Sequence, residues 1–230
     1  MKTIGVIGGM SWQSSKFYYE YLNMLTAEHL GGNHSAKIIM SSVDFREVEL
    51  LFAAEDWQGL GRMMAHEAKK LEWAGAKCLI LATNTVHLVS DAIREAVAIP
   101  FLHLTEVVGQ AIQEKGLKKV ALLGTKFTME KGFYADILNN QFDVQTITPN
   151  EEERVYLQEL IFNELVKGQF TVMARENCLR IIKRLQGQGA EGVILGCTEF
   201  PILIPKNAVE IPVFDTTMLH SKAAVDFALG

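Results

Sequence analysis

The sequence is poor in cysteine and has no long apolar run. Three cysteines occur among 230 residues, and none of them forms a CxxC pair. An odd number of cysteines argues against a disulfide framework and is typical of a reducing compartment. No stretch reaches the roughly 18 apolar residues of a membrane span, and the first residues lack the long apolar segment of a signal peptide. We therefore expect a cytoplasmic protein with no membrane partner.

A surplus of basic residues is also absent. The chain carries 27 acidic and 22 basic residues, so its formal net charge is −5. Nucleic-acid binding is not expected, because neutralising phosphates needs clustered lysine and arginine. The remaining composition, 49% hydrophobic and 21% charged, is typical of a globular protein and excludes disorder and collagen-like structure. The length suits one large domain or two small ones.

Short apolar runs alternate with longer amphipathic stretches along the chain. The runs are rich in Ile, Val and Leu and predict strands at Thr3–Ile7, Lys37–Ser41, Cys78–Ala82, Phe101–His103, Val120–Leu123, Val144–Ile147, Val193–Leu195 and Val213–Phe214. Two intervening stretches, Trp57–Trp73 and Met173–Leu185, place apolar residues on one face and predict helices, and Thr216–Leu229 is expected to form the last helix. Short buried strands that alternate with helices predict parallel sheets with helices on both faces.

Two segments of the sequence resemble two later ones. KTIGVIGG from Lys2 is similar to KKVALLGT from Lys118, and LILATNTVHL from Leu79 is similar to VILGCTEFPI from Val193. The offsets of 116 and 114 residues are each about half the chain and favour a duplicated half. We therefore predict an α/β fold of two pseudo-symmetric domains, with residues 1–99 plus 213–230 in the N-terminal domain and residues 100–212 in the second.

The duplication indicates where a site would lie. In open parallel sheets, ligands bind at the carboxyl ends of the strands. If the two halves face each other, Thr83 and Cys197 occupy equivalent positions on the two walls of a cleft. The glycine-rich turn at Gly8 to Ser11 then corresponds to Gly124–Thr125. We therefore expect the active site in the cleft between the domains.

Cys197 is the cysteine that the pattern favours for chemistry. It follows an apolar strand in the segment Gly-Cys-Thr-Glu, which is predicted to open a helix. A helix N-terminus and nearby N–H groups stabilise a thiolate, so we expect the pKa of this thiol to fall from about 8.5 toward neutrality. The alternative is a buried small hydrophobe, the usual fate of a free cysteine. We expect that fate for Cys78, in an apolar strand, and Cys178, in an amphipathic helix.

Several other polar residues have two interpretations each. Thr83 or Asn84 could cap the following helix. Alternatively, their hydroxyl, amide and backbone N–H groups could bind the carboxylate of a ligand at the helix N-terminus. His87 could be an acid or base, or a first-turn residue bonded to the backbone. Arg46 and Lys167 are isolated cations that spacing alone does not single out. The glycines at the first turn do not form GxGxxG or a Walker motif, and the histidines have no metal-like spacing.

Taken together, these motifs resemble the aspartate/glutamate racemase family. The match runs in order over essentially the whole chain. It rests on five segments: Gly8-Gly9-Met10-Ser11-Trp12 with Tyr18-Tyr19, Thr83-Asn84-Thr85-x-His87, Leu123-Gly124-Thr125-x-x-Thr128-Met129, Gly196-Cys197-Thr198-Glu199 and Pro212-Val213-Phe214-Asp215-Thr216. The Gly-Gly-Met-Ser-Trp start and the Gly-Cys-Thr-Glu element are together quite specific.

The resemblance implies racemisation without a cofactor, by two bases on opposite faces of the substrate α-carbon. The family usually has Cys-Asn-Thr at the first turn, where this chain has Thr83, so one of the two thiols is replaced by a hydroxyl. Cys197 and Thr83 are then the catalytic pair, and Cys197 takes the proton from L-aspartate or L-glutamate. The implied substrate-binding residues are Met10, Ser11, Arg46, Asn84, Thr85, Thr125, Thr128, Lys167, Thr198 and Glu199. A small-molecule amino acid is the expected partner, no metal is expected, and the family tends to form homodimers.

Three alternatives stay open on the sequence. The first is a racemase of broader amino-acid specificity. The second is a decarboxylase of the same fold, in which a single thiol protonates one face of a carbanion. The third is a binding protein for an acidic amino acid, left over when a catalytic thiol was lost. Thr83 keeps the third alternative open, and the intact Cys197 segment argues against it.

Overall fold

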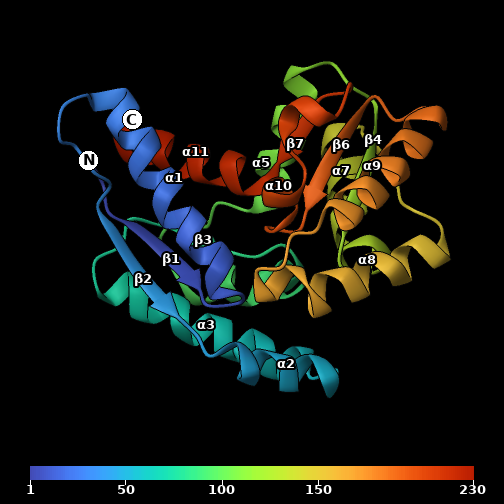
Figure 1. Ribbon diagram of the computed structural model, residues 1–230. Helices are drawn as coiled ribbons and strands as arrows, with labels where there is room; N and C mark the ends of the chain where they lie inside the picture. Colours follow the sequence, from blue (N-terminus) through green and yellow to red (C-terminus); the bar gives the residue numbers. More distant parts are fainter. The chain divides into compact units, whose positions relative to one another are not determined.

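The structure is a computed structural model that describes residues 1–230, apart from the side chain of Lys206. The chain forms two compact units (Figure 1). Unit 1 comprises residues Met1–Leu104 and His220–Gly230, and unit 2 comprises Thr105–Leu219. Each unit contains one parallel β-sheet.

Unit 1 is built on a three-stranded sheet in the order β2 (Ile38–Ser42), β1 (Ile4–Gly8), β3 (Cys78–Leu81). An isolated parallel bridge between Leu79 and Phe101 extends it beyond β3. Strands β1 and β3 are buried along their whole length, which explains their uninterrupted apolar sequences. The helices wholly or partly in this unit are α1 (Trp12–Leu30), α2 (Phe45–Ala53), α3 (Trp57–Trp73), α4 (Ser90–Ala96), the 3₁₀ helix η1 (Thr85–Val89) and the C-terminal part of α11 (Thr216–Leu229).

Helix α3 covers one face of this sheet, and α1 lies on the other (Figure 1). The Asp56 side chain caps α3 by accepting the Gly59 N–H at 2.7 Å. Leu60, Met64 and Leu71 then recur at helical spacing on the buried side, where they pack with Ile7. The predicted bounds of this helix are confirmed.

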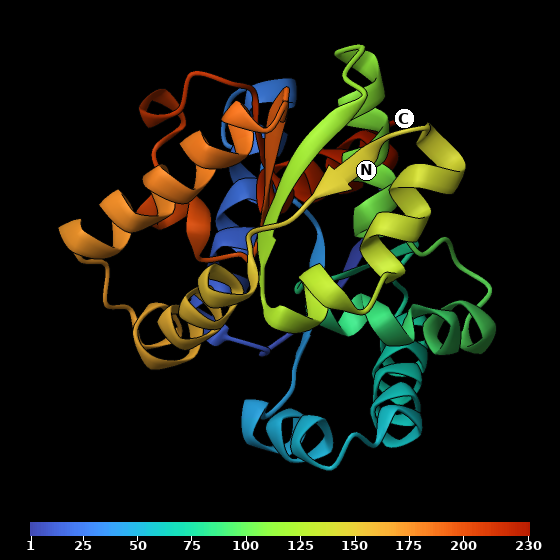
Figure 2. The same cartoon turned by 90° about the vertical axis from the view of Figure 1, so that its right-hand side faces the viewer.

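Unit 2 is built on a four-stranded parallel sheet. Its order is β5 (Gln145–Ile147), β4 (Lys119–Gly124), β6 (Gly192–Gly196), β7 (Val213–Asp215). Figure 2 shows β4 between β5 and β6. The other elements are α5 (Leu104–Glu114), which begins at the last residue of unit 1, α6 (Lys126–Glu130), α7 (Phe133–Phe142), α8 (Glu151–Asn163), η2 (Leu165–Lys167), α9 (Val172–Gly187), α10 (Phe200–Leu203), η3 (Lys206–Ala208) and the first turn of α11.

The two sheets share one topology, which confirms the α/β class and the duplicated half. Ile4 of β1 pairs with Cys78, and the residue 116 positions later, Val120, pairs with Gly192. The Leu79 N–H donates to the Pro100 carbonyl at 2.8 Å, and the Val193 N–H donates to the Pro212 carbonyl at 2.9 Å. Strand register therefore makes Thr83 in unit 1 the counterpart of Cys197 in unit 2.

The unit boundaries differ from the predicted ones by a few residues. Strand β7 pairs with β6, so residues 213–219 belong to unit 2 rather than to the N-terminal domain. Residues 100–104 belong to unit 1, because Pro100 and Leu102 are hydrogen-bonded to Leu79 of β3. The strand predicted at Phe101–His103 is reduced to the single bridge at Phe101.

No helix in the described part of the chain combines the length and the apolar character that crossing a membrane requires.

Candidate functional site

The turn after β1 is held in a conformation that needs glycine. Gly9 has φ +94°, and a Cβ atom on it would lie 2.2 Å from the Val43 carbonyl oxygen. Its N–H donates to the Ser15 hydroxyl at 2.9 Å. Met10 and Ser11 follow, both buried, and Ser11 also has a positive φ of 65° just before α1 begins. The first turn of this long helix carries no acidic residue, so its backbone N–H groups are suited to binding an anion.

The turn after β3 carries Thr83, Asn84 and Thr85. All three side chains are largely buried at the carboxyl end of the strand. Asn84 stands at the N-cap of η1, but its side chain makes no capping hydrogen bond. The capping role that the sequence allowed for Asn84 is therefore not observed. This turn leads into a 3₁₀ helix rather than directly into an α-helix.

His87 contacts the backbone through both ring nitrogens, which favours the second of its two interpretations, a residue bonded to the backbone. Its Nε2 accepts the Leu104 N–H at 3.2 Å, so the hydrogen lies on Nδ1, which donates to the Thr83 carbonyl at 2.7 Å. Burial lowers the pKa of His87 well below its usual range, and the neighbouring His103 and His220 lower it further. The ring is neutral, both nitrogens are engaged, and the Thr83 atom it touches is the carbonyl rather than the hydroxyl.

Two further histidines join His87 in a buried cluster. The rings of His87 and His103 are 4.7 Å apart between centroids, and those of His87 and His220 are 5.9 Å apart. His220 Nε2 lies 2.7 Å from the Leu102 carbonyl, and its Nδ1 lies 3.1 Å from the Tyr18 hydroxyl. Sequence reasoning missed His220, because only the fold brings it beside His87.

Cys197 lies directly after β6 and is buried, with 7% of its surface exposed. Its Sγ–H donates to Glu199 Oε2 at 3.0 Å, and the Thr198 hydroxyl donates to the same oxygen at 2.9 Å. Glu199 is 2% exposed, and its other oxygen, Oε1, has no partner among the described residues. In this turn a thiol and a hydroxyl therefore donate hydrogen bonds to the same carboxylate oxygen.

The pKa predicted for Cys197 is corrected by this geometry. Burial raises the pKa of the thiol well above its usual value, and the Glu199 carboxylate raises it further. The N–H groups of Thr198 and Glu199 act in the opposite direction but do not prevail. The helix expected here, α10, has only four residues and begins at Phe200, so it supplies no strong dipole at the thiol.

The turn after β4 lies beside Cys197 in unit 2. Gly124 pairs with Gly196, so the next residue of each strand, Thr125 and Cys197, leaves the sheet at adjacent positions. The Thr125 hydroxyl caps α6 by accepting the Thr128 N–H at 3.2 Å, and the two threonine hydroxyls are 3.1 Å apart. Both side chains are buried. The structure therefore brings the predicted residues Thr125, Thr128, Cys197 and Thr198 to one edge of one sheet.

The two predicted cations lie at the surface. Arg46 is in the first turn of α2, its side chain is 71% exposed, and its guanidinium pairs with Glu49 at 3.3 Å. Lys167 is exposed at the end of η2. The buried turns described above therefore contain neither cation.

Cys78 and Cys178 are core residues, as the sequence predicts. Both are fully buried, and burial raises the pKa of each thiol to about 12. Within the described part of the chain, no group of three or more His, Cys, Asp or Glu side chains is placed to hold a metal ion.

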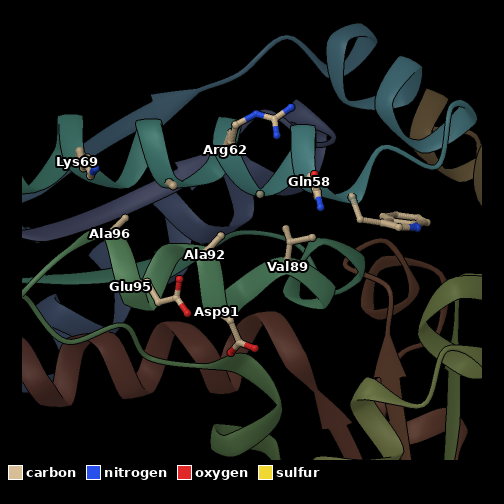
Figure 3. Close-up of a pocket in the computed structure, with 11 residues that line it drawn as sticks. Gln58, Arg62, Lys69, Val89, Asp91, Ala92, Glu95 and Ala96 are labelled. Atoms are coloured by element: carbon tan, nitrogen blue, oxygen red, sulfur yellow. The ribbon is translucent and has the colours of Figure 1, made fainter.

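A surface groove of about 610 Å³ lies in unit 1 between α3 and α4 (Figure 3). Its basic side chains, Arg62 and Lys69, come from α3, and its acidic ones, Asp91 and Glu95, come from α4. None of the site residues predicted from the sequence lines it.

Comparison with known proteins gives a consistent result. Residues 7–224 match the family described as Asp/Glu/Hydantoin racemase. A Yersinia pestis structure assigned as an Asp/Glu racemase matches with a TM-score of 0.93 and 42% identity, covering 100% of both chains. An aspartate racemase homologue from Pyrococcus horikoshii OT3 matches with a TM-score of 0.88 and 35% identity, again over 100% of both.

The curated relatives match over shorter segments. The broad specificity amino-acid racemase RacX of Bacillus subtilis (strain 168) is 25% identical over 163 residues, which cover 71% of this chain and 70% of that protein. The chain spans about half the length of the glutamate racemases that it matches.

Proposed function

Because the chain belongs to the Asp/Glu/Hydantoin racemase family, we propose that it racemises acidic amino acids without a cofactor, taking the α-proton from L-aspartate or L-glutamate. The observation that carries this proposal is the buried Cys197 thiol, which lies at the carboxyl end of β6 and is hydrogen-bonded to Glu199. A racemase must remove a proton from one face of the α-carbon and return one to the other. A desolvated thiolate is a suitable base for the first of these steps.

Thr83 is the proposed group on the opposite face. Its position in the β3 turn matches that of Cys197 in the β6 turn by strand register. A threonine hydroxyl is far too weak an acid to supply an alkoxide near neutral pH, but it can donate or relay a proton. His87 is bonded to the Thr83 carbonyl and to Leu104, so the proposed relay runs through water rather than through this ring.

The buried residues of the turns would bind the substrate's α-carboxylate and ammonium group. The proposed ligands are Met10, Ser11, Asn84, Thr85, Thr125, Thr128, Thr198 and Glu199. Glu199 Oε1 suits the ammonium group, because it is a buried acceptor without a donor. Arg46 and Lys167 are proposed to bind the side-chain carboxylate, as charge-assisted donors.

Thermodynamics constrains an enzyme with one strong base. Enantiomers have equal free energy in water, so the forward and reverse kcat/KM values for racemisation must be equal. This equality concerns inversion and does not set the rate of α-proton exchange. An enzyme with a weak group on one face can exchange the α-proton of the L-form much faster than it inverts the centre. We propose that the asymmetry between Cys197 and Thr83 produces this behaviour.

The substitution Cys197→Ser tests the proposal directly. A serine hydroxyl keeps the size but not the acidity of the thiol, so α-proton exchange of the L-substrate should fall by at least about 100-fold. Cys178→Ala, in the core of α9, is the matched control and should leave exchange per folded molecule unchanged. Wild-type exchange in Cys197→Ser would refute the assignment of Cys197.

Further substrates separate the remaining alternatives. Exchange of many neutral amino acids would indicate broad specificity, which the relative RacX carries in its name. Carbon dioxide release from a substituted malonate would indicate a decarboxylase. Thermal stabilisation by aspartate without any exchange would indicate a binding protein.

A further inference from the structure

We propose that Glu199 accepts the thiol proton of Cys197 when the thiolate forms, so that the two side chains work as a pair sharing one proton. This inference rests on the proposed function and assigns to Glu199 a role on the thiol in addition to substrate binding. Both residues lie in one turn of unit 2, directly after β6.

The geometry supplies a direct path for the proton. Sγ of Cys197 lies 3.0 Å from Glu199 Oε2, with the thiol as donor. The Thr198 hydroxyl donates to the same oxygen at 2.9 Å and fixes the carboxylate in this orientation. Sulfur and oxygen are therefore in hydrogen-bond contact before any substrate group is needed to align them.

Charge conservation explains why such a pair is useful in a buried turn. Losing the thiol proton to water would leave a thiolate and a carboxylate side by side, two negative charges in a site with little solvent. Moving the proton to Glu199 leaves one negative charge before and after the step. The cost of a second buried charge is thereby avoided.

The step balances within the pair. The S–H bond of Cys197 breaks, an O–H bond forms on Glu199 Oε2, and the negative charge moves from oxygen to sulfur. The thiolate then takes the α-proton, so that the substrate C–H bond breaks and the S–H bond forms again. The carbanion then takes a proton from water on the face assigned to Thr83. Glu199 still holds the thiol proton at that stage and returns it to solvent after product release, which restores the starting number of protons.

The surrounding elements bring few other charges to this turn. The adjacent end of β4 carries the uncharged Thr125 and Thr128. The adjacent end of β7 carries Asp215, whose Oδ1 accepts the Met218 N–H at 3.0 Å. Glu199 is the carboxylate that acts on the thiol, through both its charge and its hydrogen bond.

The substitution Glu199→Gln makes two predictions of opposite sign. Glutamine keeps an oxygen that can accept from the thiol but carries no charge and does not take the proton. Alkylation of Cys197 by iodoacetamide at pH 8, followed by peptide mass spectrometry, should become at least about 10-fold faster, because removing the carboxylate makes the thiolate easier to form. Exchange of the L-aspartate α-proton should fall by at least about 100-fold, because bound substrate keeps water from taking the thiol proton and glutamine does not accept it.

A structural or a merely inhibitory role of Glu199 would give other patterns. Faster alkylation together with faster exchange would show that Glu199 only suppresses the thiol, and would overturn the proposal. Unchanged exchange would overturn it as well. Glu159→Gln makes the same chemical change at an exposed position of α8 and should alter neither rate.

The alkylation measurement needs no substrate, so it can be judged apart from the racemase activity. Absence of exchange in the wild type, with faster alkylation in Glu199→Gln, would overturn the proposed function and with it the catalytic role of the pair. If Glu199→Gln does not fold, infrared difference spectra of the wild type decide the matter. Adding L-aspartate labelled with ¹³C at both carboxyl groups should produce the carbonyl band of a protonated protein carboxyl, and absence of that band would overturn the proposal.

Discussion

At the scale of single residues, the two equivalent turns carry different chemistry. Cys197 has a hydrogen-bonded carboxylate two residues away, whereas Thr83 has only its hydroxyl, with its carbonyl held by His87. The sequence shows directly that one turn carries a threonine and the other a cysteine. It does not show that Cys197 is more basic than an ordinary thiol, because burial and the Glu199 charge are tertiary effects. The expectation of a lowered thiol pKa fails for that reason.

Introducing a second thiol should relieve the asymmetry between the two turns. Thr83→Cys places a stronger acid–base group at the position equivalent to Cys197, so α-proton exchange of D-aspartate or D-glutamate should rise by at least about 10-fold. Proton NMR in deuterium oxide measures the change. No gain with either D-enantiomer, in a variant that still exchanges the L-form, would count against Thr83 as the opposite group.

His87 is expected to stabilise the fold rather than to move protons. His87→Leu leaves the buried Thr83 carbonyl and Leu104 N–H unpaired, which should cost roughly 2–5 kcal/mol of unfolding free energy. His66→Leu, at an exposed position of α3, is the control and should cost little. Urea unfolding gives both values. Full stability in His87→Leu would contradict the hydrogen-bond assignment.

At the scale of elements, the turn after β1 depends on one glycine whose neighbours leave no room for a Cβ atom. Gly9 and Gly75 have similar positive φ angles, +94° and +101°, but only Gly9 faces a backbone at the place of a Cβ atom. Gly75→Ala should therefore cost only the strain of a positive φ, about 1–2 kcal/mol. Gly9→Ala should cost clearly more and also lower α-proton exchange, because the Val43 carbonyl must move. Equal stability of the two variants in thermal unfolding would refute this account.

Seven of the eight predicted strands and the three helices that were given bounds from the sequence are observed. Buried strands show apolar runs, and α3 shows helical periodicity with an aspartate cap, so the bounds agree to within a residue or two. The short elements around the site could not be predicted. The four residues of α10 and the 3₁₀ helix η1 are too short to leave a periodic pattern, and their geometry depends on the strand ends that they leave.

At the scale of the whole molecule, the duplicated topology provides one polar turn at the carboxyl end of each central strand. The register of the two sheets makes the turns equivalent, and the similarity between the two halves of the sequence could show this in advance. The histidine cluster could not be found in this way. His220 is far from His87 and His103 in the chain, and only the fold brings the three together.

This cluster makes a prediction for the pH dependence of stability. Burial lowers the pKa of His103 to about 3 and that of His220 to about 4. Between an unfolded pKa of about 6.5 and these values, the unfolded chain binds more protons, so unfolding free energy should fall as the pH drops through this range. His220→Gln should remove roughly 3 kcal/mol of that pH dependence. His34→Gln, at an exposed position, is the control and should leave the change of unfolding free energy with pH unaltered. An unaltered pH dependence in His220→Gln would contradict a neutral, buried His220.

The proposed function requires Cys197 to remove the α-proton of an acidic L-amino acid. The most direct measurement is proton NMR in deuterium oxide with each enantiomer of aspartate and of glutamate, with optical rotation read on the same samples. We predict loss of the α-proton signal that is much faster for an L-form than for the D-forms, accompanied by slower loss of rotation. Absence of exchange with all four compounds would contradict this role of Cys197.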